Sequence, residues 1–349
     1  MNRKIFSKFL LILFIIGLIV SCEYDETEGY FDADDPNIQY TGRFDFSNSK
    51  SVRFDWPGVQ IKAYFSGTYC GVRFKDGNND YNIFINGKLH KVLRTTSDTI
   101  YTIAEKLKKK RHSLLITKRT EGIFGVASFE GLILNPGERL YPVLKGKRRK
   151  IEFIGDSFVA GFGSEGKSPD CLFSKETENN YITYGPVLAR RLKADYTIVA
   201  VSGIGIVRNH GDSLTTSMQP LPNYYDRVCL NDTIKWDFQK WQPDLVVVRL
   251  GRNDYWQKPF PTRATFRKAY IDFLKRIRSL YTKAHILALC GPVRKDPHCD
   301  YIRSAVTEME NKLQDKKIQF VRLDIKCTER FWMPKTSERN RAQKDSRCT

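Results

Sequence analysis

The sequence has few histidines and cysteines, the residues that most often bind zinc. Its 349 residues include five histidines and eight cysteines, and the cysteines form no C-x-x-C pair and no zinc-binding spacing. Positive charge is in excess, because the chain has 58 lysines and arginines but only 39 acidic residues. A net charge of +19 can attract polyanions. The basic residues are spread along the chain without a nucleic-acid-binding motif, so we predict no nucleic-acid partner.

The sequence also lacks an apolar run long enough to cross a bilayer comfortably. Its longest run, Phe9–Val20, follows three basic residues and is typical of a signal peptide. The run leads into Leu18–Cys22, which resembles a bacterial lipobox, whose cysteine is lipidated and becomes the first mature residue. We therefore expect a lipoprotein signal peptide over residues 1–21 and an exported protein anchored to a membrane through Cys22. An ordinary signal peptide is the alternative.

Residues 22–37 are acidic and contain few apolar side chains, which predicts an unfolded tether. Seven cysteines remain after Cys22, and an odd number cannot all pair within one chain. We expect most of them to be small core residues, although a disulfide is compatible with an exported protein.

Residues 38–145 contain short runs in which apolar and polar residues alternate, such as Val59–Phe65 and Tyr81–Ile85. This alternation is typical of half-buried strands. Asn86-Gly87 predicts a tight hairpin, because both residues tolerate positive φ. Without a long helical pattern, the segment is predicted to form a β-sandwich, either for glycan binding or for scaffolding.

Residues 146–326 alternate strands with helices. Continuous apolar runs such as Leu245–Leu250 indicate a parallel sheet covered on both faces, and Thr265–Tyr281 has a helical pattern. Ligands bind such sheets beyond the carboxyl ends of the strands.

Three motifs lie at those strand ends, namely Gly155-Asp156-Ser157, Ser202-Gly203-Ile204-Gly205 and Gly251-Arg252-Asn253-Asp254. Each alone is also compatible with a helix cap or a turn. Together they supply a serine hydroxyl, a glycine amide and an asparagine carboxamide, which are the groups that acyl transfer requires.

These motifs resemble blocks I to III of the SGNH (GDSL) hydrolases. Val207–Asn209, Trp236–Phe238 and Trp241–Asp244 further resemble carbohydrate esterase family 2, and the likeness covers roughly residues 38–326. The resemblance implies a jelly-roll sandwich followed by a three-layer, flavodoxin-like α/β domain. It also implies an acetylesterase that deacetylates polysaccharides without a metal or other cofactor.

By the same resemblance, Ser157 is the nucleophile, and the oxyanion hole consists of the Ser157 and Gly203 N–H groups and the Asn253 amide. Arg252 departs from the threonine usual at its position, which changes the polarity of the pocket.

A base for Ser157 is missing, because the family places an H-P dipeptide near its C-terminus and this chain has none there. The five histidines are His90, His112, His210, His285 and His298. Only His298, after the strand Ile286–Cys290, is expected at the correct sheet edge. It is a weak substitute, and a surface position is the simpler expectation.

The tail, residues 327–349, has no helical apolar stripe, although an α/β domain of this class should end in a helix on the sheet. Trp332 and Met333 have single codons, so the bases of Trp332-Met333-Pro334 must encode Gly-Cys one nucleotide later. With permitted synonymous codons, residues 330–349 then read DFGCQKHPNVIGHKKIQDA, which contains an acid, H-P-N and the start of a helix. We hypothesise a frameshift between Asp324 and Arg330, in the gene or in its sequencing.

The chain as written is therefore expected to be nearly inactive and to fold less well. The DNA around codon 327 tests the frameshift. A non-catalytic, glycan-binding surface lipoprotein is the alternative function, and acetyl transfer onto glycans also stays open.

Overall fold

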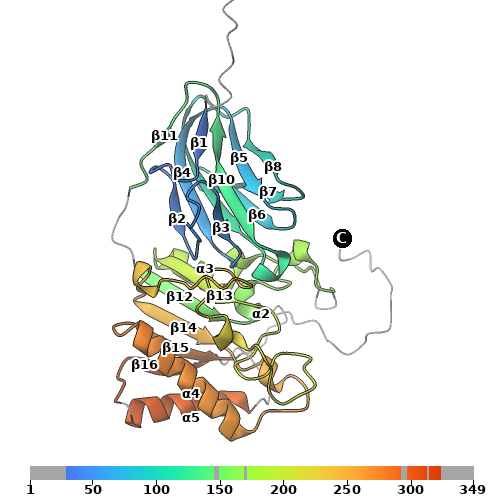
Figure 1. Cartoon of the computed structure of the whole chain (residues 1–349), viewed down its shortest axis with the longest axis vertical. Coiled ribbons are helices and arrows are strands. Elements are labelled where there is room, and N and C mark those ends of the chain that lie inside the picture. Colours follow the sequence, from blue (N-terminus) through green and yellow to red (C-terminus); the bar gives the residue numbers. More distant parts are fainter. Residues whose placement is uncertain (1–28, 145–148, 169–170, 292–296, 313, 324–349) are drawn as a thin grey trace, which may run out of the picture.

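The computed structural model describes residues 29–144, 149–168, 171–291, 297–312 and 314–323. Two antiparallel sheets form one half of this part of the chain, and a parallel sheet with helices forms the other half (Figure 1). The predicted sandwich and α/β domain are both confirmed. None of the helices described is long and apolar enough to cross a membrane. The expected signal peptide, Cys22 and the tail 327–349 lie outside the described residues.

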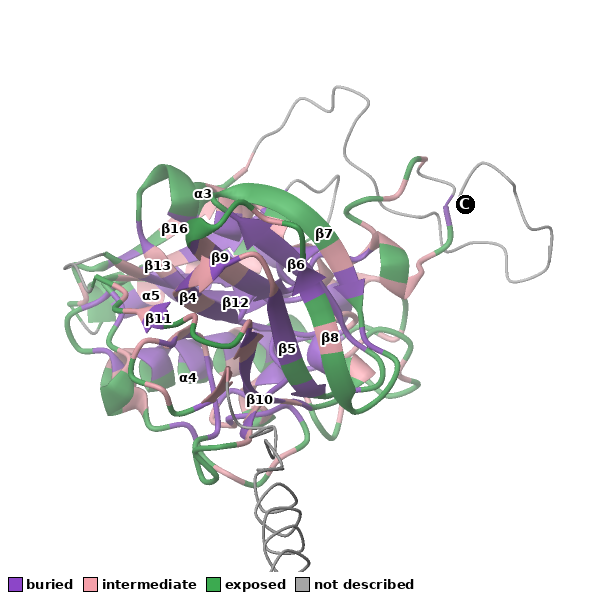
Figure 2. Cartoon of the chain, turned by 90° about the horizontal axis from the view of Figure 1, so that it is seen from above, coloured by how far each residue is buried: buried purple, intermediate pink, exposed green. Residues whose placement is uncertain are grey.

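The sandwich consists of one sheet in the order β1-β10-β5-β8, with β3 beside β10, and a second in the order β11-β4-β9-β6-β7, with β2 beside β4. The strands are β1 (Tyr30–Asp32), β2 (Gln39–Thr41), β3 (Val52–Phe54), β4 (Gln60–Gly67), β5 (Cys70–Lys75), β6 (Asp80–Ile85), β7 (Lys88–Arg94), β8 (Thr99–Ala104), β9 (Lys110–Lys118), β10 (Ala127–Leu134) and β11 (Leu140–Tyr141). Along β4, buried residues alternate with half-buried ones. The inward side chains include Phe54, Phe65 and Phe74, all fully buried, so the core between the sheets is rich in aromatic rings. The strands β7 and β8 are the most exposed (Figure 2).

The sandwich begins earlier than the sequence suggested. Strand β1 pairs with β10, with Tyr30 opposite Ile133, and Ala33 is completely buried. The expected tether over residues 22–37 is thus wrong in its second half. Strand β1 forms with few apolar residues, because the neighbouring strand supplies its backbone hydrogen bonds. The Asn86-Gly87 hairpin is confirmed, with φ of 52° and 76°.

The second domain contains a parallel sheet in the order β13-β12-β14-β15-β16. Its strands are β12 (Lys150–Gly155), β13 (Asp195–Ala200), β14 (Leu245–Arg249), β15 (His285–Cys290) and β16 (Ile318–Arg322), and its helices are α2 (Ser157–Ala160), α3 (Tyr184–Arg191), α4 (Arg263–Leu280) and α5 (His298–Lys312). Phe153 and Val247 pack with α2 and α3 on one face, and Val246 and Val248 pack with α4 and α5 on the other. The sheet is therefore the middle of three layers.

One part of this sheet is less well covered than the rest. On the face that carries α2 and α3, the side chains of Leu287, Val321 and Leu323 from β15, β16 and the residue after β16 are only partly buried among the described residues. Apolar side chains in the middle of a three-layer domain are normally covered by a helix.

The sandwich lies against the β12–β13 side of the parallel sheet (Figure 1). A single cluster of buried apolar side chains includes residues of both domains. Within the interface, Arg43 forms an ion pair with Glu152 at 3.1 Å, and both side chains are completely buried. Tyr225 donates its hydroxyl to the same carboxylate at 2.7 Å. The two domains are thus joined by buried apolar and charged contacts.

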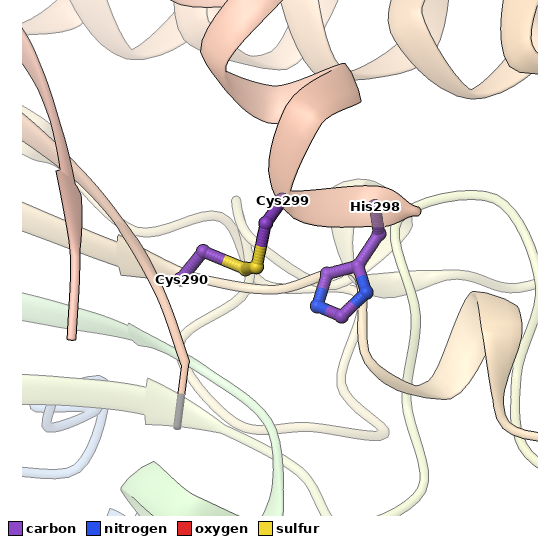
Figure 3. Close-up of side chains that lie close together, drawn as sticks. All are labelled: Cys290, His298 and Cys299. Atoms are coloured by element: carbon purple, nitrogen blue, oxygen red, sulfur yellow. A yellow bond between two sulfur atoms is a disulfide. The ribbon is translucent and has the colours of Figure 1, made fainter. Parts of the chain in front are cut away.

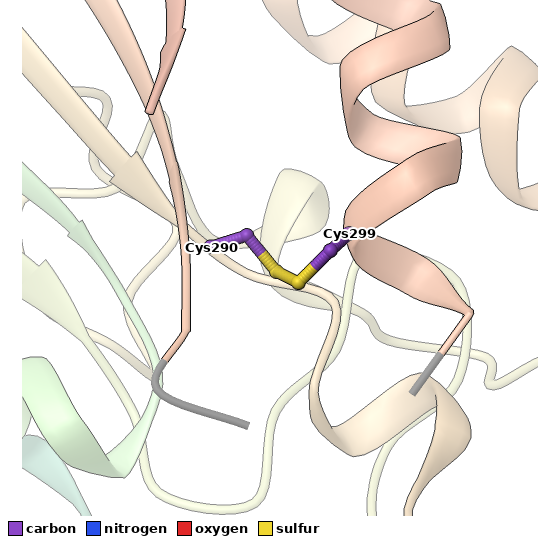
Figure 4. Close-up of a disulfide and its surroundings, with 2 residues drawn as sticks. All are labelled: Cys290 and Cys299. Carbon is purple, nitrogen blue, oxygen red and sulfur yellow. A yellow bond between two sulfur atoms is a disulfide. The ribbon is translucent and has the colours of Figure 1, made fainter. Parts of the chain in front are cut away.

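A disulfide joins Cys290, the last residue of β15, to Cys299 in the first turn of α5 (Figure 4). The sequence left this pairing open. Cys70 and Cys229 are free buried thiols, as expected for small core residues.

Candidate active site

The Ser157 segment is a tight turn between β12 and α2. Asp156 caps the helix by accepting the N–H of Phe158 at 3.1 Å, and its carboxylate also accepts a hydrogen bond from Arg249 at 2.7 Å. Asp156 and Arg249 are buried, whereas Ser157 is half-buried. The turn therefore fixes the backbone at the end of the strand, where Ser157 stays partly exposed.

The Gly203 loop follows β13, the neighbour of β12. Gly203 adopts φ of 77°, a left-handed conformation that favours glycine, and its carbonyl accepts the N–H of His210 at 2.7 Å. Val201 donates its N–H to the carbonyl of Gly155 at 3.3 Å. This contact joins the Gly203 loop to the strand that carries the serine.

Asn253 begins the short helix η6 (Asn253–Tyr255) after β14, which borders β12 on its other side. The side chain is buried, and its Nδ2 donates to the carbonyl of Ile204 at 2.7 Å. The structure thus brings the segments of Ser157, Gly203 and Asn253 together at the carboxyl edge of three adjacent strands. Their catalytic roles stay predictions.

Asp254 is a site residue to which the sequence gave no role. It is completely buried and accepts backbone N–H groups of Ile206 at 3.0 Å, Val207 at 2.8 Å and Arg208 at 2.9 Å. Burial raises the pKa of Asp254 to about 6, although the three donors favour its charged form. The carboxylate holds the Gly203 loop against η6. The sequence feature that could have indicated this role is the position of Asp254 directly after Asn253.

Arg252, which replaces the family's threonine, lies beside an aromatic ring. Its guanidinium is 4.6 Å from the centre of the Trp256 ring, and the His210 ring is 5.8 Å from that ring. Burial lowers the pKa of Arg252. This side of the site is consequently aromatic and cationic.

Among the described contacts, no hydrogen bond joins the Ser157 hydroxyl to His90, His112, His285 or His298. His90 is exposed on β7, and His285 is exposed at the start of β15. His112 is buried in β9, where its ring bonds to Asn86 and to the carbonyl of Lys108.

His298 lies beyond the end of β15, on the expected edge, but it is buried and not on the surface as predicted. Its side chain packs beside Gly251 and stacks on Tyr255 with ring centres 6.2 Å apart. Burial, assisted by the nearby Arg252 charge, lowers the pKa of His298 to about 3. A base this weak is poorly matched to removing a serine proton near neutral pH.

Among the described residues, one group of side chains has the composition of a metal site. Ligand atoms of Cys290, His298 and Cys299 lie within 4.8 Å of one another (Figure 3). The thiolate is the form of cysteine that binds metals, and both sulfurs are bonded in the disulfide. With both sulfurs in the disulfide, the group could offer a metal ion one ligand, the His298 imidazole.

A serine at a strand end, beside a glycine loop and a buried asparagine on a three-layer sheet, defines a GDSL-type SGNH hydrolase. Residues 153–339 match the GDSL-like lipase/acylhydrolase family, and residues 40–143 match the family described as carbohydrate esterase 2 N-terminal. The chain belongs to carbohydrate esterase family 2 and is by family an acetylesterase.

Known proteins resemble the chain along most of its length. It is 35% identical over 299 residues to the cellulase/esterase CelE of Acetivibrio thermocellus, covering 83% of this chain and 36% of CelE. The chain thus spans about a third of that protein. It is 25% identical to an acetylxylan esterase/glucomannan deacetylase of Cellvibrio japonicus, covering 82% of each.

A solved structure of a family two carbohydrate esterase from Clostridium thermocellum, in complex with cellohexaose, matches with a TM-score of 0.77 and 30% identity over 82% of this chain and 88% of that one. A family two carbohydrate esterase from Cellvibrio japonicus shares the fold, with a TM-score of 0.76 and 22% identity over 84% and 88% of the two chains.

Proposed function

We propose that this chain is a carbohydrate O-acetyl esterase that acts on acetylated polysaccharides or oligosaccharides through Ser157. The observation that carries the proposal is the meeting of the Ser157, Gly203 and Asn253 segments at one sheet edge. Relatives that are described as acetylxylan esterase/glucomannan deacetylase, or that were solved with cellohexaose, support a glycan as the substrate.

The arrangement suits a two-step acyl transfer. Ser157 Oγ attacks the acetyl carbonyl carbon, and its proton passes to a base. The bond between that carbon and the sugar oxygen then breaks, and the base returns the proton to the sugar oxygen, which leaves as a hydroxyl. Water then releases acetate from the acetyl-serine. The Asn253 amide has two N–H bonds. One is held by the Ile204 carbonyl, so the other can point at the oxyanion together with the Ser157 and Gly203 N–H groups.

The chain as written lacks the base and turns over very slowly. Two observations support this part of the proposal. His298 is too weak a base, and Leu287, Val321 and Leu323 are only partly buried on the face of the sheet that carries α2 and α3. We call the variant in which residues 330–349 are replaced by DFGCQKHPNVIGHKKIQDA the frame-restored chain.

A non-catalytic glycan-binding protein is the second candidate, because the described site has oxyanion donors without a base. Titrating the full chain and Ser157→Ala with acetylated and deacetylated xylo- and gluco-oligosaccharides separates the two. The esterase proposal expects tighter binding of the acetylated form and acetate release by the frame-restored chain that Ser157→Ala abolishes. Equal affinity for both forms, without acetate release by the frame-restored chain, would favour the binding protein.

For localisation, we propose an exported lipoprotein anchored through Cys22, based on the lipobox-like sequence. When the full chain is produced in a bacterium, it is expected in the detergent-soluble membrane fraction. Cys22→Ser should move it to the soluble fraction. An ordinary signal peptide predicts the same fraction for both chains.

A further inference from the structure

The turn after β9 carries a sandwich residue into the hydrolase domain. Glu121 is completely buried, and its Oε2 accepts the backbone N–H of Ser202 at 2.5 Å. Ser202 directly precedes Gly203, the predicted oxyanion donor. A carboxylate from the sandwich therefore fixes the residue that precedes this donor.

The turn itself is held by a buried lysine. Lys118 is completely buried, and its ammonium donates to the carbonyls of Thr120 at 2.6 Å and Glu121 at 3.2 Å. The backbone that presents the Glu121 side chain is thus fixed in place.

The same turn also supports the helix that begins at Ser157. Asn180 donates its backbone N–H to the carbonyl of Arg119 at 3.0 Å. Its side-chain Nδ2 donates to the carbonyls of Val159 at 2.7 Å and Ala160 at 3.1 Å, at the end of α2. The sandwich is therefore connected to both the nucleophile helix and the Gly203 loop.

A second buried carboxyl group, Glu178, faces Glu121 from the hydrolase domain. Burial, reinforced by the neighbouring Glu121 charge, raises the pKa of Glu178 to about 9. Burial raises the pKa of Glu121 as well, while its hydrogen bond from Ser202 and the Lys118 charge favour its charged form.

We infer that Glu121 is a positioning residue for the oxyanion hole, so that the sandwich domain is a working part of the esterase site. The inference rests on the proposed function and adds a residue from the other domain to it. Without the carboxylate, the Val201–Ser202 peptide, whose N–H it accepts, can rotate and displace the next peptide, which carries the Gly203 N–H. Removing one oxyanion donor outright costs about 10²- to 10³-fold in kcat, so misaiming one is expected to cost about 10- to 100-fold.

Hydrogen exchange tests the positioning without any need for turnover. In the full chain, Glu121→Ala is expected to speed amide exchange of peptides containing Ser202 and Gly203 by about tenfold, the value of one hydrogen bond. Glu121→Gln should retain most of the protection, because its amide oxygen still accepts. Glu130→Ala is the matched control, since Glu130 pairs with Arg73 and Lys75 inside the sandwich. Parent-like exchange in Glu121→Ala would overturn the inference.

Kinetics of the frame-restored chain provide the second readout. Glu121→Ala should lower kcat for an aryl acetate by about 10- to 100-fold with KM nearly unchanged, and Glu121→Gln should stay within about threefold. If the parent turns over and Glu121→Ala equals it, Glu121 does not position the site. If the frame-restored parent shows no turnover, the proposed function fails, while hydrogen exchange still decides the role of Glu121.

A folding defect does not obscure the result. If Glu121→Ala does not fold, Glu121→Asp is compared with Glu121→Gln by the same two measurements. The shorter aspartate cannot reach the Ser202 N–H, so it should behave as a loss of the contact. Equal exchange and equal kcat for the two variants would overturn the inference.

Discussion

The frame-restored chain is expected to hydrolyse acetyl esters with a kcat about 10⁶-fold above that of the chain as written, because removing the base of a serine–histidine pair costs about this much. The replaced segment returns an acid and an H-P dipeptide to the positions that the family uses. The segments that carry the predicted oxyanion donors already meet at the sheet edge beside the Ser157 turn. Acetate release from acetylated xylan and hydrolysis of an aryl acetate measure the change.

Two variants of the frame-restored chain act as controls for this prediction. Changing the histidine of H-P to alanine, or Ser157→Ala, should each return the rate to that of the chain as written. The hypothesis is contradicted if the chain as written is already as active as the frame-restored chain, because a base would then lie elsewhere. It is also contradicted if the frame-restored chain is folded and remains inactive.

Glu152→Ala is expected to lower the free energy of unfolding by about 3 to 5 kcal/mol, because it leaves the buried Arg43 charge without its partner. Arg43 comes from the sandwich and Glu152 from β12, and neither side chain is exposed. The guanidinium would retain only the carbonyls of Tyr225 and Arg227 and the surrounding aromatic rings. Denaturant unfolding of the parent and the variant measures the loss in the free energy of unfolding, provided that the two chains have equal m-values.

An exposed ion pair gives the control for the buried one. Asp272→Ala breaks a pair with Lys268 in which both side chains are largely exposed, and it should cost less than about 0.5 kcal/mol. The double variant Arg43→Met/Glu152→Leu should recover most of the stability that Glu152→Ala loses, because apolar residues can replace a buried pair. An effect of Glu152→Ala as small as that of Asp272→Ala would contradict a structural role of the pair.

The sequence predicted the fold because strong local patterns determine it. Alternation in Val59–Phe65 and the continuous apolar run in Leu245–Leu250 indicate different kinds of sheet, and β4 and β14 occur at these positions. The Asn86-Gly87 hairpin likewise follows from local backbone preferences. Short edge strands carry no such pattern, so β1 at Tyr30–Asp32 was read as part of a tether.

The site was only partly predictable for a related reason. Ser157, Gly203 and Asn253 each follow a strand, so their shared edge could be inferred from the sequence alone. Glu121 is 81 residues away from its partner Ser202 in the sequence, and no local sequence pattern predicts that contact. His298 looked like a surface residue because its burial comes from long-range packing against Gly251 and Tyr255.

Covalent labelling with an aryl phosphonate tests the central claim most directly, because an activated serine attacks phosphorus, displaces the phenolate and keeps the phosphonyl group. Mass spectrometry of peptides from the chain as written and the frame-restored chain locates the adduct. We predict a single adduct on Ser157 in the frame-restored chain and almost none in the chain as written at the same time and dose. Labelling of another serine, or equal labelling of Ser157 in both chains, would contradict the account.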